Sequence, residues 1–580
     1  MDVENQQSVD IVVDEFRQIL IWPLLLQFGA AEQFCMKTVS EKLTASNWRL
    51  VQESQDTNAW KIGDDDWYKT KDENGNYVNK HEYDYSEIVY FHSFVRNFLY
   101  GGDGLAAEKR PMRVFHPDLK ATESSSRSES THSKLKDLKH LYVQLKGDRD
   151  FYLKVERIEA YLADTGVLVV TIEVFCNTHH DGASEKPLKL SDALDLQNLL
   201  RMVFPRRWSS SGDPSETPLQ MAWAKDTTIE GRQSFEIIED SSQNFRDKGS
   251  FTRIVRENAE IPVANHLAYL LKPLIPYDPP IQPKDITYKQ IEDQRIPSMS
   301  FIAVEEPRQI TEWDFARIAF FDSHGESTVS CYSDDFMQDW KTPHAYDRFW
   351  QRKPSLLQTN LSDPAKLAEH NNMVRTRWLC SGYGFSVVGS SKDSVFMGQI
   401  KSNFHHHYFR MGFIAHFHRA SLLALREELS KSMNKNGVEF HDAVIRIQKN
   451  CTRFRTRFWY HEVSTQLQGQ EIFRWWSNQL GNQELFDKVT SDVEALASLV
   501  RTEIAERESE NIKWLTFYGL LVGLIGVFTG FVSAVLTGVL GAWGTVSKYG
   551  YAVLIFSLVV FVVICVVFFR NRARLVKKWM

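Results

Sequence analysis

The pattern of apolar and charged positions changes sharply near Trp514. Charged residues are spread through the first 513 positions, but only one, Lys548, lies among the next 56. Two uncharged runs occur there, Trp514–Val539 and Tyr551–Phe569, with 26 and 19 residues. An α-helix needs about 20 apolar residues to cross the hydrocarbon layer of a bilayer. The pattern therefore predicts a hairpin of two transmembrane helices over 514–569.

Basic residues flank this predicted hairpin unequally. The tail 570–580 contains no acid and five basic residues, namely Arg570, Arg572, Arg574, Lys577 and Lys578. The loop between the spans contains only Lys548. Because basic flanks stay in the cytosol, we expect a multi-pass protein of the inner (plasma) membrane with both termini cytosolic. Six scattered cysteines without a C-x-x-C pair agree with a reducing compartment.

Small residues recur along the first predicted span at intervals of three and four. They are Gly519, Gly523, Gly526, Gly530, Ser533 and Thr537. This period places all of them on one stripe of a helix. Such a stripe is typical of a face that packs closely against another helix in lipid. It also suits a narrow pore on the axis of an oligomer, where hydroxyls would meet a partly hydrated ion. Both interpretations stay open.

A helical stalk is predicted over 398–513, a region without proline. Chain breakers at Asn434–Gly437 and Gly481 divide it into three helices, at about 403–433, 438–480 and 482–513. Apolar residues in the last of these recur every three or four positions and continue into the first span without a breaker. One continuous helix is therefore expected from the stalk into the membrane.

Four glutamates precede the first span: Glu503, Glu506, Glu508 and Glu510. In a ring of subunits their carboxylates would concentrate cations at the cytosolic mouth of a pore. Basic residues lie among them, so an ordinary solvated helix surface is the alternative interpretation.

The fold class expected for the whole chain is α+β, with a large mixed α/β cytosolic domain over 1–397. Its clearest element is a β-hairpin at 155–175 that turns at Asp164-Thr165-Gly166. We expect further strands at 19–28, 140–146, 300–305, 316–321 and 377–388, and helices near 86–99, 191–203 and 260–272. Mobile loops are expected at 120–133 and 209–218, and a proline-rich linker at 275–284 would subdivide the domain.

Linear catalytic motifs are missing from the sequence, so we do not expect an enzyme. Neither the phosphate loop G-x-x-x-x-G-K-[ST] nor H-E-x-x-H occurs. The net charge of −6 argues against nucleic acid as a partner. His405-His406-His407 would point about 100° apart on a helix and could not close one metal site. Neither they nor His179-His180-Asp181 are assigned as metal ligands.

Arginines and aromatic residues interleave within the stalk at Arg453, Arg455 and Arg457. Guanidinium groups could hold an anionic ligand here while an aromatic ring stacks on a base. The alternative is that these arginines pair with glutamates of the stalk or lie along its surface.

The order of domain, stalk, two spans and basic tail resembles the CorA-type magnesium transporter family. The likeness covers roughly 400–580. It is carried by Lys577-Lys578-Trp579-Met580 at the end of the chain, by Asn511–Thr516 before the first span, and by Phe458–Val463 with Gln466 and Gln468 in the stalk. The family's Gly-Met-Asn selectivity motif is missing; the corresponding stretch reads Ala534-Val535-Leu536-Thr537-Gly538.

This resemblance implies a homo-oligomer, a pentamer in the family, that conducts cations under control of its cytosolic domain. Mg²⁺ is the family's ion, but its selectivity cannot be carried over without the motif. One alternative is a membrane effector of a bacterial antiviral (CRISPR-type) system, opened by a nucleotide second messenger, because the cytosolic part is unusually large. Another is a membrane scaffold without a pore.

Overall fold

A computed structural model describes the chain in two compact units, Met1–Glu494 and Ala495–Met580. Each unit is described by itself. The described residues are 11–28, 34–45, 48–51, 69–71, 77–79, 89–100, 106–117, 138–145, 149–177, 187–205, 220–229, 232–238, 251–256, 259–271, 274, 286–292, 295–323, 332–346, 376–392, 394–542, 555 and 559. The predicted loops at 120–133 and 209–218 and the linker at 275–284 lie outside them.

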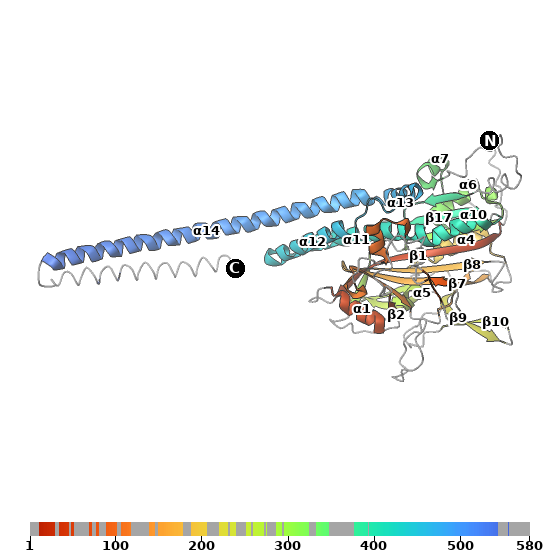
Figure 1. Ribbon diagram of the computed structural model, residues 1–580, viewed down its shortest axis with the longest axis horizontal. Helices are drawn as coiled ribbons and strands as arrows, with labels where there is room; N and C mark the ends of the chain where they lie inside the picture. The colour runs from red at the N-terminus through yellow and green to blue at the C-terminus, as the bar shows by residue number, and fades with distance from the viewer. Residues whose placement is uncertain are drawn as a thin grey trace. The chain divides into compact units, whose positions relative to one another are not determined.

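The first unit is built on a 13-stranded, mixed β-sheet (Figure 1). Its long central strand β1 (Val13–Phe28) pairs antiparallel with β8 (Val167–Asn177) on one side and with β14 (Ser298–Val304) on the other. The sheet continues from β8 to β7 (Arg149–Ala163), and from β14 to β17 (Gly384–Ser390) through a parallel pair. The expectation of a mixed α/β region is therefore confirmed.

Shorter strands complete the sheet at both ends. Beyond β7 and β17 lie β6 (His140–Leu145), β9 (Gln220–Ile229), β10 (Arg232–Ile237), β16 (Arg377–Cys380) and β15 (Ala345–Tyr346). Off this path, β13 (Ile286–Gln290) pairs with β1, β5 (Met112–Pro117) with β7, and β2 (Trp48–Leu50) with β5. Two-stranded ribbons are formed by β11 (Phe251–Arg256) with β12 (Ala259–Ala264), and by β3 (Lys69–Lys71) with β4 (Tyr77–Asn79).

Side chains alternate between the two faces of the central strands. One face carries the main apolar core, in which Phe16, Leu20 and Trp22 of β1 are fully buried. Helices α4 (Leu190–Leu199), α5 (Asn265–Leu271), α6 (Glu312–Phe320) and α1 (Met36–Ala45) contribute side chains to this core. Burial of this apolar surface is the main stabilising contribution on that face.

Helix α11 (Phe409–Ser432) packs against β1 and β8 from the opposite face (Figure 1). It follows α10 (Ser394–Asn403) and a π-helical turn, Phe404–Tyr408. Next come α12 (Gly437–Arg457), α13 (Leu467–Gln479) and α14 (Asn482–Ala542). The single unbroken helix expected from residue 482 into the apolar stretch after Trp514 is therefore confirmed as α14.

A buried ion network lies between the sheet and these helices; we define it as Arg17, Arg157, Glu159, Glu173 and Arg410. Glu173, whose side chain is 0 % exposed, lies 2.9 Å from Arg17 and 3.0 Å from Arg157. Arg410 lies 3.4 Å from Glu159, and both side chains are almost fully buried. Buried carboxylates need such partners, because an unpaired buried charge is strongly destabilising.

Several predicted elements differ from the structure. Residues 316–321 were expected as a strand but lie mostly in α6, whose start is capped by Thr311: its Oγ1 accepts a hydrogen bond from the Asp314 N–H at 3.1 Å. The strand expected at 377–388 is a hairpin of β16 and β17, turned at Gly382 with φ 84°. Of the helix expected at 260–272, residues up to Ala264 belong to β12. The helix expected near 86–99 is α3, Ser93–Tyr100.

The prediction of a single helix over 438–480 is also wrong, because the chain leaves the helical conformation between α12 and α13. Phe458 takes φ −124° and is fully buried. Six residues later Ser464 forms a β-bridge with Phe91, and its hydroxyl donates a 2.6 Å hydrogen bond to the carbonyl oxygen of Tyr90. These tertiary contacts end the helix without glycine or proline.

Candidate membrane helix and ligand pocket

Within the described residues, α14 is the one helix long and apolar enough, by length and composition, to cross a membrane. Its apolar stretch has no buried part in the isolated chain. Leu515, Leu520, Val522 and Val527 are each more than 60 % exposed. An apolar surface of this extent requires cover from lipid or from other protein. The second predicted span, 551–569, and the tail 570–580 lie outside the described residues, except that Ile555 and Val559 are helical.

The predicted pore stripe is exposed along α14. A Cβ atom built on Gly519, Gly523, Gly526 or Gly530 meets no described atom within 4 Å outside the local helix. Ser533 and Thr537 are exposed as well. The Thr537 hydroxyl donates a 2.7 Å hydrogen bond to the carbonyl oxygen of Ser533. This bond uses the hydroxyl proton and leaves the oxygen lone pairs facing outward, where they could accept from water or contact a cation.

The four predicted mouth glutamates do not share one face of α14. A helix turns once in about 3.6 residues, so Glu508, eleven residues before Gly519, lies about three full turns away and on the glycine face. Glu510 lies about two and a half turns from Gly519 and therefore on the opposite face. By the same count, Glu503 and Glu506 also lie away from the glycine face. Only Glu508 is placed to face a pore that the glycines would line.

The three predicted ligand arginines lie on α12 but point to different neighbours. Arg457 donates a 3.0 Å hydrogen bond to Asp164 in the turn between β7 and β8. Arg455 lies 3.8 Å from Glu494, which is the pairing with the stalk named as the alternative. Arg453 lines a pocket with Asp164. The structure therefore separates the three and places one of them at a cavity.

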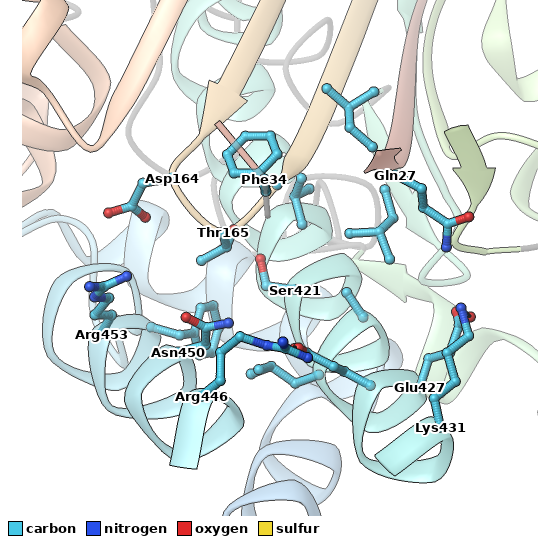
Figure 2. A pocket seen from close by; sticks show the side chains of 18 residues that line it. Gln27, Phe34, Asp164, Thr165, Ser421, Glu427, Lys431, Arg446, Asn450 and Arg453 are labelled. Atoms are coloured by element: carbon cyan, nitrogen blue, oxygen red, sulfur yellow. Dashed lines mark hydrogen bonds and ion pairs between the residues drawn. The ribbon is translucent and has the colours of Figure 1, made fainter. Parts of the chain in front are cut away.

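We name this cavity the hairpin–helix pocket (Figure 2). It has a volume of about 330 Å³ and lies between the β7–β8 turn, the end of β1, α11 and α12. Its polar lining includes Asp164, Thr165, Ser421, Glu427, Glu428, Lys431, Arg446, Asn450 and Arg453. Its apolar lining includes Leu25, Phe34, Val167, Leu425 and Phe454.

Sequence reasoning named Arg453 but missed the residues that face it across the pocket. The Asp164-Thr165-Gly166 segment was predicted only as a turn. Ser421 lies within α11, and no local sequence pattern identifies it as a pocket residue. One available signal was the spacing of Arg446, Asn450 and Arg453 at intervals of four and three, which places them on one face of α12.

The histidines have structural partners. His405 Nδ1 lies 2.7 Å from the Glu173 carboxylate, and His407 Nδ1 lies 2.9 Å from the Asn403 side chain and stacks on Tyr90. His416 and His418 are buried in α11. The described part of the chain contains no cluster of three or more residues able to hold a metal ion. His179-His180-Asp181 lies outside the described residues.

Comparison of the chain with protein families, curated proteins and solved structures gives no match.

Proposed function

We propose that this chain is a CorA-like, homo-oligomeric membrane channel or transporter for cations, controlled by its cytosolic first unit. The observation that carries the proposal is the exposed stripe of small residues on the apolar half of α14. Side chains of this size let helices approach one another closely around an axis. They would leave a pore lined by backbone and hydroxyl oxygens, which are suitable contacts for a hydrated cation such as Mg²⁺.

The proposed arrangement is a pentamer in the inner (plasma) membrane, with both termini in the cytosol. The basic tail and the single lysine of the predicted outer loop support this orientation. In each subunit α14 would pass from the cytosolic unit into the membrane without a break, so movement of the first unit could be transmitted to the pore. A ring of Glu508 carboxylates would raise the local cation concentration at the cytosolic entrance.

Ion flux in liposomes tests the proposal, with a magnesium-sensitive dye and a membrane-potential dye present together. Uptake of Mg²⁺ or depolarisation supports a conducting pore. Depolarisation only after addition of small-molecule extract from phage-infected cells favours the effector opened by a nucleotide signal. The absence of both Mg²⁺ uptake and depolarisation, with and without the extract, favours the non-conducting scaffold.

Replacing Gly526 and Gly530 together by leucine separates a pore stripe from a packing stripe. If the stripe lines a pore, the variant loses conduction but stays oligomeric on size-exclusion chromatography. If the stripe serves helix packing alone, the oligomer dissociates. Replacement of Leu520 by valine, at an exposed position off the stripe, is the control and should change neither property.

A further inference from the structure

The hairpin–helix pocket contains buried polar groups whose hydrogen-bonding capacity is unused. Ser421 is 2 % exposed, and its Oγ has no hydrogen-bond partner among the described residues. Thr165 Oγ1 and Asp164 Oδ1 are likewise buried without a partner in the described structure. All three residues line the same cavity, as Figure 2 shows. Buried polar atoms are nearly always satisfied in native proteins, so these three indicate that something polar occupies the pocket.

The charges around the pocket are paired, with one exception. Glu428 lies 3.0 Å from Arg446, Glu427 lies 2.9 Å from Lys431, and Asp164 is bound by Arg457. Arg453 forms no ion pair within 4 Å with a described carboxylate, although its charge acts on Asp164 across the pocket and opposes the rise that burial causes in the pKa of that carboxyl. It is exposed, and the neighbouring Asn450, one turn earlier on the same helix face, has no side-chain hydrogen bond to a described residue. A guanidinium beside an amide is a donor pair suited to one carboxylate or phosphate group.

The unpaired guanidinium and the unsatisfied buried polar atoms together exclude two kinds of ligand, simple inorganic anions and apolar molecules. A simple inorganic anion would satisfy Arg453 but is too small to reach Ser421 and Thr165 as well and to cover the apolar lining. An apolar molecule would fit against Leu25, Val167 and Phe454 but would leave Ser421 and Asp164 unsatisfied. A volume of about 330 Å³ suits one small organic molecule, near the lower end of the ~300–1,000 Å³ typical of ligand pockets.

We propose that the hairpin–helix pocket binds a small hydroxylated organic anion. Its carboxylate or phosphate accepts hydrogen bonds from Arg453 and Asn450. Its hydroxyls donate to Asp164 Oδ1 and accept from Ser421 and Thr165, and its carbon skeleton lies against the apolar lining. The site lies wholly within the first unit and does not depend on whether α14 forms a pore.

Equilibrium dialysis of the full-length protein in detergent tests this proposal. Glucose 6-phosphate serves as the phosphate ester and gluconate as the carboxylate, so the two arms distinguish the two anionic groups. Glucose lacks the anion, and inorganic phosphate lacks the hydroxyls. At least one of the first two should bind saturably, and about tenfold more tightly than glucose or inorganic phosphate, because both parts of the ligand are needed.

Arg453→Gln should weaken that binding by about tenfold or more, since it removes the charge that faces the anion. Arg455→Gln is the matched control: it is an exposed arginine on the same helix that lies beside Glu494 instead. Ser421→Ala should also weaken binding, while the thermal midpoint of the ligand-free protein should not fall, because the replaced hydroxyl has no partner to lose.

Three results would overturn the proposal. One is that neither hydroxylated anion binds saturably. Another is that inorganic phosphate binds as tightly as the organic probes, which would mean an adventitious ion only. The third is that Arg455→Gln weakens binding as much as Arg453→Gln. Binding is measured here without any ion flux, so a silent channel would not affect the outcome.

Discussion

The Glu173 carboxylate on β8 accepts a 2.9 Å hydrogen bond from the Arg17 guanidinium on the neighbouring strand β1, and no part of the Glu173 side chain reaches solvent. Arg157 on β7 and His405 in the π-helical turn reach the same carboxylate. Side chains from three adjacent strands and from the helical layer therefore meet at one buried carboxylate. Burial alone would raise the pKa of Glu173, but Arg157, His405 and Arg17 outweigh it and lower the pKa to about 2.

We expect Glu173→Gln to destabilise the first unit by about 3–5 kcal/mol, because it leaves buried arginines without their counter-charge. The measurement is the unfolding midpoint of the full-length protein in detergent. Glu156→Gln is the control. Glu156 also approaches Arg17, at 3.8 Å, but its side chain is 41 % exposed, and an exposed pair contributes at most about 1 kcal/mol. Equal effects of both changes would show that the buried pairing does not matter.

The pH dependence of the Glu173 contribution follows from the lowered pKa. A glutamate in the unfolded chain has a pKa of about 4.3. Because the folded-state pKa is lower, the stabilisation is fully present above about pH 4.3 and is lost as the pH falls towards 2. The acid-unfolding curve of Glu173→Gln should therefore be flatter than that of the wild type in this window.

The buried imidazole of His266 leads us to expect a second loss of stability, at a higher pH than the one caused by Glu173. It is fully buried, and its Nε2 lies 3.0 Å from the carbonyl oxygen of Leu200. Burial lowers the pKa of His266 to about 4, although the Leu200 carbonyl acts in the opposite direction. The unfolded imidazole takes up its proton near pH 6.5, so the stabilisation by neutral His266 is present above about pH 6.5 and decreases towards pH 4.

His266→Gln removes this titration while keeping a side-chain N–H for the Leu200 carbonyl. We expect the drop in thermal midpoint between pH 7 and pH 5 to become smaller in the variant. It should not vanish, since burial lowers the pKa of His416 and His418 as well. Exposed His461→Gln is the control: it acts only indirectly, through the charge near His418, and should change the drop much less than His266→Gln does. An unaltered drop in His266→Gln would contradict the assignment.

Elements with strong local signals were predictable from the sequence. The β7–β8 hairpin follows from two β-rich runs around Asp164-Thr165-Gly166, and Gly166 takes φ 88° as such a turn requires. The continuity of α14 follows from an apolar period with no breaker. The mistaken strand at 316–321 is a short apolar run that suits a strand or a buried helix equally; the cap at Thr311 decides for helix.

The interruption after Phe458 and the hairpin–helix pocket depend on contacts between distant residues. Ser464 is held by Tyr90, and Ser421 faces Thr165 across the cavity, yet neither serine carries a local signal. Arg453 could be named because alternating arginines and aromatics are a local pattern. Which of the three arginines meets a pocket depends on how α12 is rotated against the β7–β8 turn, and no short-range pattern encodes that rotation.

Two helical glycines should respond in opposite ways to alanine. A Cβ atom on Gly412 of α11 would lie 2.4 Å from Trp476 Cη2 of α13, far inside contact distance. Gly398 of α10 is exposed, and no described atom outside the local helix lies within 4 Å of such a Cβ. We expect Gly412→Ala to destabilise by about 1–3 kcal/mol, and Gly398→Ala to stabilise by about 0.5–1 kcal/mol. Thermal unfolding of both variants measures the difference, and a Gly412→Ala variant as stable as the wild type would contradict the packing of α11 on α13.

The proposed orientation of α14, with its glycine face towards a pore, leads to a last prediction about Glu508 and Glu510. Glu508 lies about three turns before Gly519 and shares its face, while Glu510 lies on the opposite face. Both are exposed, and both are followed within the helix by the same apolar stretch. In the proposed oligomer a ring of Glu508 carboxylates would attract cations to the entrance, whereas Glu510 would face away from the axis.

Glu508→Gln should therefore lower cation flux into liposomes several-fold at low ionic strength, and the loss should shrink at high salt, because salt screens a ring of exposed charges. Glu510→Gln should leave flux near the wild-type value at both salt concentrations. Equal losses in the two variants would show that the glutamates act only through overall charge. A loss in Glu510→Gln alone would mean that the opposite face of α14 lines the conducting path, and that the glycine stripe packs against a neighbouring helix instead.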